Sequence, residues 1–332
     1  MLHRLLLVAI GCTLAAAGQP KKILLTIDDP SLLQQFQRVT PLARIVPVTR
    51  ATLITEIADA DAVIGSVSPA AVRAARRLKW VQALSAGVEH LLFPDLRDSA
   101  IVLTNNKIVQ GPEIADHAMA LLLTLSRRLN LLAAKQAQGE WDRSDYTGIE
   151  LNGKTAVIVG VGGIGTQIAV RASAFGMRVI GVDPEDRPYL PSIARMVKPD
   201  QLDTVLPEAD VVFIAAPHTP QSRKMIGTRQ FELMKPHSYF IAVSRGALYD
   251  MDGLVHALDG KRLDGAGVDV TDPEPLPKGH PLWKFENAIV TPHIAGQSDQ
   301  VGARLAATVE ENIRRFVEGK PLINVVDKQK GY

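Results

Sequence analysis

The stretch TAVIVGVGGIG, residues 155–165, decides the fold of this chain of 332 residues. A run of apolar and β-branched residues leads directly into a loop of glycines, and TQIAVRASAF follows with the spacing of a helix. A strand, a glycine-rich turn and a helix in this order are typical of a dinucleotide-binding βαβ unit. The loop consists of Gly160, Gly162, Gly163 and Gly165, with Val161 and Ile164 between them. Glycines here permit a tight turn, the approach of a pyrophosphate and close packing of helix on strand.

An acidic residue completes this unit. The next predicted strand, MRVIGVD, ends in Asp183, eighteen residues after Gly165. A carboxylate at this place accepts hydrogen bonds from the adenosine ribose and repels a 2′-phosphate, so we expect NAD rather than NADP. Arg187 follows closely enough to keep NADP as the alternative. The N-terminus of the helix offers free amides and a positive dipole end to the phosphates.

On both sides of this stretch, short β-branched runs alternate with longer helical segments. We expect strands in KKILLTI, ARIVPV, DAVIGS, WVQALS and IVLTNN before it, and in MRVIGVD, DVVFIAA, SYFIAVS, GAGVDV and NAIVTP after it. A helical stretch over residues 112–138 is too long for a simple crossover and is expected to bridge two domains. A last helix is predicted over residues 298–318. This alternation indicates parallel sheets with helical crossovers.

The chain is therefore expected to be an α/β protein with two Rossmann-like, doubly wound parallel-sheet domains and a cleft between them. Its length suits two domains of about 150 residues each. We assign residues 21–110 plus 298–332 to a flavodoxin-like substrate domain. Residues 111–297 are assigned to an NAD-binding Rossmann domain.

Charge and cysteine content exclude several functions. Lys plus Arg (37) and Asp plus Glu (35) nearly balance, and no basic stripe forms, so no nucleic-acid partner is expected. The single cysteine, Cys12, lies in the N-terminal apolar run, which leaves the globular part without thiol chemistry or disulfides. The histidines show no metal-binding spacing, so no metal is expected.

Residues 1–20 differ from the rest of the chain. A basic start and an apolar run over residues 5–17 are typical of a secretory signal, which would be cleaved near Gly18. The run is too short for a stable membrane span. A lipoprotein site at Cys12, a misassigned start or an apolar tail are the alternatives. A signal suggests export, whereas the supply of cofactor suggests the cytoplasm, so the location stays open.

Three ionisable residues follow strands of the second half. Arg245 comes after SYFIAVS, Glu274 lies in TDPEPLP after GAGVDV, and His293 follows NAIVTP. Arginine binds a carboxylate through two parallel hydrogen bonds, histidine exchanges a proton near neutral pH, and a neighbouring carboxylate favours and orients the imidazolium. This set suits hydride transfer to a 2-keto acid, and the alternative is three solvated loop residues. Asp269 is a candidate for the nicotinamide amide or a loop cap.

After residue 21 the chain resembles the D-isomer-specific 2-hydroxyacid dehydrogenase family. The resemblance is carried, in order, by SAGVEHL, GEW, LNGKTAVIVGVGGIG, FGMRVIGVDP, ADVVFIAAPHTPQS, SRGALYD, GVDVTDPEPLP and HPLWKFENAIVTPHIAG. It implies that Arg245, Glu274 and His293 are catalytic. It also implies that the amides of Ala86 and Gly87 help to hold the substrate carboxylate. The implied cofactor contacts are Ile164, Gly165, Asp183, Pro217, Val243 and Asp269.

One departure concerns the loop of Arg245, where Ala242 stands in place of the family's usual asparagine and puts the loop geometry in question. The length and SAGVEHL look most like glyoxylate/hydroxypyruvate reductases, although the sequence does not select one 2-hydroxy acid. We expect a homodimer. A dinucleotide-sensing, co-repressor-like binding protein on the same fold is the alternative function, because fold does not determine activity.

Overall fold

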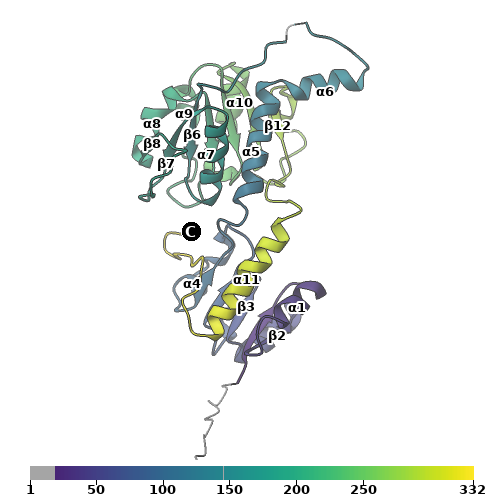
Figure 1. The fold of residues 1–332 in the computed structure, drawn as a ribbon, viewed down its shortest axis with the longest axis vertical. Helices are drawn as coiled ribbons and strands as arrows, with labels where there is room; N and C mark the ends of the chain where they lie inside the picture. The colour runs from purple at the N-terminus through teal and green to yellow at the C-terminus, as the bar shows by residue number, and fades with distance from the viewer. Residues whose placement is uncertain (1–18, 145) are drawn as a thin grey trace, which may run out of the picture.

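The computed structural model describes residues 19–144 and 146–332. The signal expected in residues 1–17 lies outside them. Within the described part of the chain, no helix is both long enough and apolar enough to cross a membrane. Two lobes lie one above the other in Figure 1, and each is built on its own parallel sheet.

The small lobe is built on a five-stranded sheet of order β2-β1-β3-β4-β5, which is the flavodoxin-like order. Its strands are β1 (Lys21–Leu25), β2 (Ala43–Pro47), β3 (Ala62–Ile64), β4 (Trp80–Gln82) and β5 (Val102–Thr104). Helices α2 (Arg50–Glu56), α3 (Pro69–Ala74) and α4 (Pro94–Arg97) contribute to the core on one face, and α1 (Pro30–Gln37) and α11 (Val301–Val317) to that on the other. Ser68 caps α3 by accepting from the amide of Ala71.

The large lobe is built on a seven-stranded parallel sheet of order β12-β11-β10-β9-β6-β7-β8. Its strands are β6 (Thr155–Val159), β7 (Arg178–Val182), β8 (Arg195–Val197), β9 (Val211–Ile214), β10 (Ser238–Ala242), β11 (Leu263–Val268) and β12 (Ala288–Val290). One face is covered by α5 (Gly111–Ser126) and α7 (Gly163–Ala174), and the other by α8 (Leu202–Val205), α9 (Thr228–Leu233) and α10 (Met251–Asp259). Two doubly wound parallel-sheet domains are confirmed.

One local prediction is wrong, and one strand was not predicted. The single helical stretch over 112–138 is divided into α5 and α6 (Leu129–Ala137), because Arg128 has a left-handed backbone with φ of +52°. A left-handed residue cannot continue a right-handed helix. The sequence analysis also missed β8, a three-residue edge strand whose Arg195 and Met196 are exposed and give no apolar run.

The last helix returns the chain to the small lobe. Ala306, Val309 and Ile313 of α11 pack with Ile23 and Trp80 of the five-stranded sheet. These contacts support the division into residues 21–110 plus 298–332 and residues 111–297, which we keep as a proposal.

A buried polar contact fixes α11 on the small lobe. The Asn312 amide donates to Gln82 Oε1 at 2.9 Å, and Asn312 Oδ1 accepts from the amide of Ile323 at 2.8 Å. Both side chains are fully buried. The chain after α11 is therefore tied back to the small-lobe sheet.

Candidate active site

The predicted site residues of the large lobe lie at one edge of its sheet. The loops after the carboxyl ends of β6, β7, β9, β10, β11 and β12 carry, respectively, the glycine loop, Asp183, Pro217, Val243 with Arg245, Asp269 with Glu274, and His293. Ligands of open α/β sheets bind outside the carboxyl ends of the strands. The sequence-predicted residues are thus brought to the edge where a ligand is expected.

The glycine loop has the close contacts that its sequence predicts. Gly160 has φ of +91°, and a β-carbon there would overlap the backbone of Ala216. A β-carbon on Gly165 would overlap the Gly160 carbonyl, whereas one on Gly162 would meet only open space. Helix α7 begins at Gly163 and carries Ile164 in its first turn, so its free amides face the loop. The loop therefore fits a pyrophosphate.

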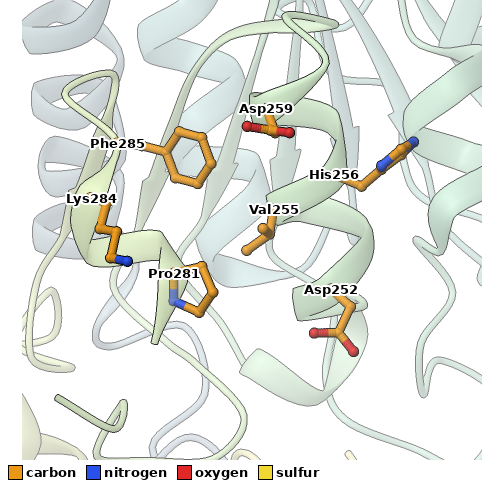
Figure 2. A pocket seen from close by; sticks show the side chains of 7 residues that line it. All are labelled: Asp252, Val255, His256, Asp259, Pro281, Lys284 and Phe285. Carbon is orange, nitrogen blue, oxygen red and sulfur yellow. The ribbon is translucent and has the colours of Figure 1, made fainter. Parts of the chain in front are cut away.

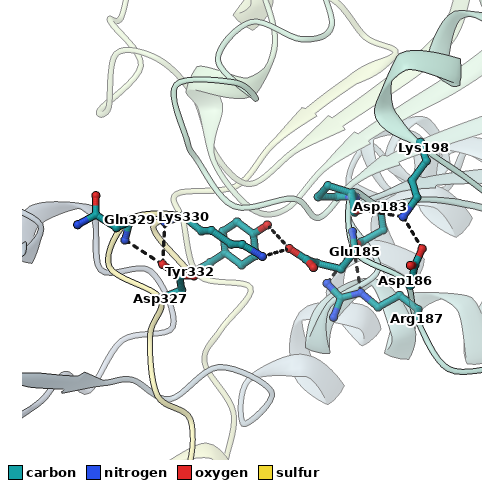
Figure 3. Close-up of polar contacts among 10 residues, drawn as sticks. Asp183, Glu185, Asp186, Arg187, Lys198, Asp327, Gln329, Lys330 and Tyr332 are labelled. Atoms are coloured by element: carbon teal, nitrogen blue, oxygen red, sulfur yellow. Dashed lines mark hydrogen bonds and ion pairs between the residues drawn. The ribbon is translucent and has the colours of Figure 1, made fainter.

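Asp183 is buried and accepts four hydrogen bonds. Its Oδ2 accepts from the amide of Val161 at 2.8 Å, and its Oδ1 accepts from the amide of Glu185 at 2.9 Å. Arg187 donates to both oxygens, from Nε at 3.0 Å and from Nη2 at 3.1 Å. Figure 3 shows Arg187 and the loop after β7 beside this carboxylate. Arg187, which the sequence analysis treated as a neighbour, is the direct partner of Asp183.

Three further predicted cofactor residues lie after neighbouring strands. Pro217 is exposed, Val243 is buried, and Asp269 is buried with its carboxylate turned to the loop that carries His293. Asp269 accepts from the Thr291 hydroxyl at 2.6 Å and from the amides of the two residues that follow His293. Asp269 therefore fixes the His293 loop, and its contact with nicotinamide stays a prediction.

His293 and Glu274 form a pair. His293 Nδ1 lies 3.0 Å from Glu274 Oε2, and Glu274 Oε1 accepts from the amide of Thr271 at 2.9 Å. None of the residues that the structure describes hydrogen-bonds the other ring nitrogen, Nε2, and the side chain of His293 is 47% exposed. His293 has φ of +53°, a backbone conformation uncommon outside glycine, as often occurs at functional sites. Glu274 thus orients a ring whose Nε2 is open to a ligand.

Tyr249 supports the segment that leads from β11 to Glu274. Its hydroxyl donates to the Val270 carbonyl at 2.6 Å from a fully buried position. Burial raises the pKa of Tyr249 far above its usual range, and the charge of Glu274 adds to this shift. The phenol therefore stays a neutral donor.

Arg245 meets the small lobe at the loop after β4. A β-carbon at Gly87 would overlap the Arg245 guanidinium, so Gly87 allows the arginine to reach this backbone. Arg245 Nη1 donates to the carbonyl of Ser244 at 2.7 Å, and its Nε donates to Glu89 Oε1 at 3.1 Å. The structure thus brings Arg245 to the loop of Ala86 and Gly87, as the resemblance implies.

Sequence reasoning missed three residues of this site. Glu89 lies in the quoted SAGVEHL stretch, which was itself the available signal, and it pairs with Arg245. Asn105 donates to the Ala86 carbonyl at 2.6 Å, and Asn106 donates to the Leu84 carbonyl at 3.0 Å. The adjacent asparagines in IVLTNN therefore brace the Ala86 loop from the end of β5.

One surface hollow lies away from this edge. Figure 2 shows it between α10 and the short turn Pro281–Lys284, with Asp252, His256 and Phe285 on its walls. None of the candidate catalytic residues lines it. Among the residues that the structure describes, no group of His, Cys, Asp and Glu has the arrangement of a metal site.

The glycine loop, the strand order and the ionisable residues at one sheet edge define a two-lobed protein of the Rossmann dinucleotide-binding class. The profile of the D-isomer specific 2-hydroxyacid dehydrogenase NAD binding domain matches residues 119–295. The chain belongs to the D-isomer specific 2-hydroxyacid dehydrogenase family.

Individual relatives agree with this assignment. The chain is 31% identical to a glyoxylate reductase from Thermofilum pendens, over 85% of this chain and 86% of the relative. It is also 31% identical to a D-3-phosphoglycerate dehydrogenase from Methanocaldococcus jannaschii over 84% of this chain, but it spans only 54% of that longer protein. The structure of an NADPH-dependent glyoxylate/hydroxypyruvate reductase from Sinorhizobium meliloti, determined with NADP and sulfate, is similar with a TM-score of 0.81. Identity to it is 26%, and the match covers 94% of this chain and all of that one.

Proposed function

We propose that this protein is a nicotinamide-dependent oxidoreductase that interconverts a small 2-keto acid and its D-2-hydroxy acid. The observation that carries the proposal is the His293–Glu274 pair at the edge occupied by the glycine loop. Glu274 follows β11, the strand next to the β10 of Arg245, and His293 follows β12, the strand beyond it. NAD is the cofactor expected from Asp183. The glycine loop and the N-terminus of α7 would hold its pyrophosphate.

The bound cofactor would supply or accept the hydride at the substrate carbon. His293 Nε2 would give a proton to the oxygen of the keto group as it is reduced, and take one back in the oxidation. Glu274 holds the ring by Nδ1 and stabilises its positive charge. Proton transfer then occurs at one defined nitrogen.

Arg245 would bind the substrate carboxylate. Its guanidinium lies against Gly87, so an anion bound by the free N–H groups would also lie near the backbone of Ala86 and Gly87. Asn105 and Asn106 keep this backbone in place through the carbonyls of the loop. Glyoxylate and hydroxypyruvate are the substrates we propose first, because relatives that act on them match nearly the whole chain.

The test is a spectrophotometric assay of NADH oxidation with a set of small 2-keto acids, beginning with glyoxylate and hydroxypyruvate. We expect turnover that depends on the 2-keto acid. Tight NAD binding without turnover on any of them would instead support the co-repressor-like alternative. Light scattering of the same preparation tests the expected homodimer.

A further inference from the structure

His117 lies on the face of α5 that packs against the large-lobe sheet. Ile114, His117 and Leu121 are spaced three and four positions apart, which places them on one side of the helix. Ile114 and Leu121 belong to the apolar core under α5, and only 22% of the His117 side chain is exposed. Helix α5 packs against β11 and β12 (Figure 1). An imidazole in this layer needs a hydrogen-bond partner, because an unpaired polar group is costly to bury.

The partner of His117 is the threonine two residues before His293. His117 Nε2 lies 2.9 Å from Thr291 Oγ1, and the Thr291 hydroxyl donates to Asp269 Oδ1 at 2.6 Å. A hydroxyl has one proton to donate, and a carboxylate only accepts, so this proton is directed at Asp269. Thr291 Oγ1 must then accept from His117, which places a proton on the Nε2 of that ring. The hydrogen bonds therefore run in one direction, from α5 to Asp269.

Asp269 in turn holds the loop of the candidate general acid. Its side chain is almost fully buried, and it accepts from the amide of Ile294 at 3.0 Å and from that of Ala295 at 2.9 Å. The backbone carbonyl of Asp269 accepts from the amide of His293 itself at 2.9 Å. One residue thus fixes three consecutive amides, beginning with the residue whose backbone is left-handed. Such a conformation persists only where the surroundings impose it.

Loss of the His117 donor would weaken this arrangement at its first step. A hydroxyl that accepts a hydrogen bond becomes a stronger donor, so His117 strengthens the bond from Thr291 to Asp269. His117 Nε2 also lies 3.7 Å from Asp269 Oδ1, with its N–H dipole near the carboxylate. Without the imidazole, the Thr291 hydroxyl would have an empty acceptor site in a largely apolar layer and would be free to rotate. The loop of His293 would then be less firmly held.

We propose that His117 is a positioning residue for proton transfer by His293, acting through Thr291 and Asp269. The inference rests on the proposed function, because it assumes that His293 is the general acid. Two supports of His293 are thus distinct. Glu274 orients the ring through Nδ1, and the series from His117 fixes the backbone from which the ring extends.

The test is a double-mutant cycle on the rate of NADH oxidation in a single turnover with glyoxylate, which separates the chemical step from product release. His117→Leu should lower this rate by about tenfold, the effect of one hydrogen bond, with NADH affinity little changed. His117→Gln should restore most of the rate, because its amide can donate to Thr291. In a Thr291→Val background, His117→Leu should lower the rate by less than about twofold, since the series is already broken.

Gln110→Leu is the matched control. Gln110 directly precedes α5, is half-buried, and donates to the Gly296 carbonyl at 3.4 Å. It therefore also joins this helix to the segment after His293, but by a route outside Thr291 and Asp269. We expect its single-turnover rate to stay close to that of wild type, because so long a hydrogen bond is weak.

The outcomes of the cycle separate positioning from packing. Equal losses from His117→Leu in the wild-type and Thr291→Val backgrounds would overturn the proposal, because the effect would then come from packing under α5. A loss in Gln110→Leu as large as that in His117→Leu would overturn it as well, since any tether of the helix would then serve.

A second readout does not depend on turnover. Nuclear magnetic resonance of the full chain with isotope-labelled histidine reports which ring nitrogens carry protons, and the signals lost in His117→Gln belong to His117. We expect a proton on its Nε2, and an unprotonated Nε2 would overturn the proposal even in an active enzyme. A wild type that binds NADH but turns over no 2-keto acid would overturn the proposed function, and the positioning role with it, whatever the resonance spectrum shows.

Discussion

Arg245 of the large lobe donates from Nε to Glu89 of the small lobe at 3.1 Å, so an ion pair joins the lobes inside the candidate active site. About a third of each side chain is exposed, and such a pair contributes no more than about 1 kcal/mol to stability. Its importance is geometric. The pair sets the direction of the guanidinium that is proposed to bind substrate, and it places a negative charge beside that subsite.

Two substitutions of Glu89 separate these effects. Glu89→Gln keeps an acceptor for Arg245 and removes the charge, so we expect KM for the 2-keto acid to fall by about two- to fivefold. Glu89→Ala removes both, and KM should rise because the guanidinium is no longer oriented. Steady-state kinetics with glyoxylate measures both values. The same change in KM for both variants would contradict the division between charge and orientation.

His293→Ala should lower turnover by between about 10² and 10⁴, the usual contribution of a positioned general acid, with little change in NADH affinity. His237→Ala is a close control. His237 also has a left-handed backbone and a carboxylate, that of Asp264, 2.8 Å from Nδ1, but it lies at the opposite edge of the sheet, just before β10. Near-native turnover of the His293 variant would remove this residue from the mechanism.

Gly87→Ala should raise KM for the 2-keto acid by about tenfold or more, because the added methyl group overlaps the Arg245 guanidinium and displaces it. The melting temperature should change little, since the guanidinium is partly exposed and can move. Gly139→Ala is a control for replacing a glycine outside the site. A β-carbon at Gly139 would contact no other atom, although the backbone φ there is +75°. An unchanged KM would show that Arg245 does not need this space.

Asn312→Ala should lower the free energy of unfolding by about 1–3 kcal/mol, because the buried Gln82 Oε1 loses one of its two donors and the half-buried amide of Ile323 loses its acceptor. Urea denaturation measures the change. Asn130 donates to the Glu286 carbonyl in a solvent-exposed hydrogen bond and provides a control, since Asn130→Ala leaves that carbonyl open to water. Equal losses for the two variants would contradict the role given to burial.

Most strands of the two sheets could be predicted from the sequence, because each strand except β8 is a separate apolar run. The glycine loop and the residues after strand ends were predictable for the same reason, since parallel strands bring their carboxyl ends to one edge. The end of the first helix near Arg128 was not predictable, because no residue type in this stretch indicates that Arg128 adopts a left-handed backbone. The sequence pattern is that of one long helix, and only the structure shows that α5 ends before Arg128 and that α6 begins after it.

The contacts between the two lobes could not be predicted from the sequence either. Glu89 pairs with Arg245 across 156 positions, and Lys330 with Glu185 across 145. Nothing local to any of these residues indicates its partner, because each pair depends on how two independently folded sheets face each other. Asp183 is the instructive case. Its position was predicted, but the two hydrogen bonds that Arg187 donates to its carboxylate were not.

The return of α11 to the small lobe also has a consequence for biosynthesis. The ribosome makes the five strands of that lobe first, yet Ala306, Val309 and Ile313, which complete one face of their core, are made near the end. The seven-stranded lobe, continuous from α5 to β12, is complete before them. Domains fold as units while the chain grows, and exposed apolar faces promote aggregation. The small lobe, which is synthesised first, therefore finishes folding last. Until α11 is made, its apolar face around Ile23 and Trp80 stays uncovered, and this is the surface that we expect chaperones to bind.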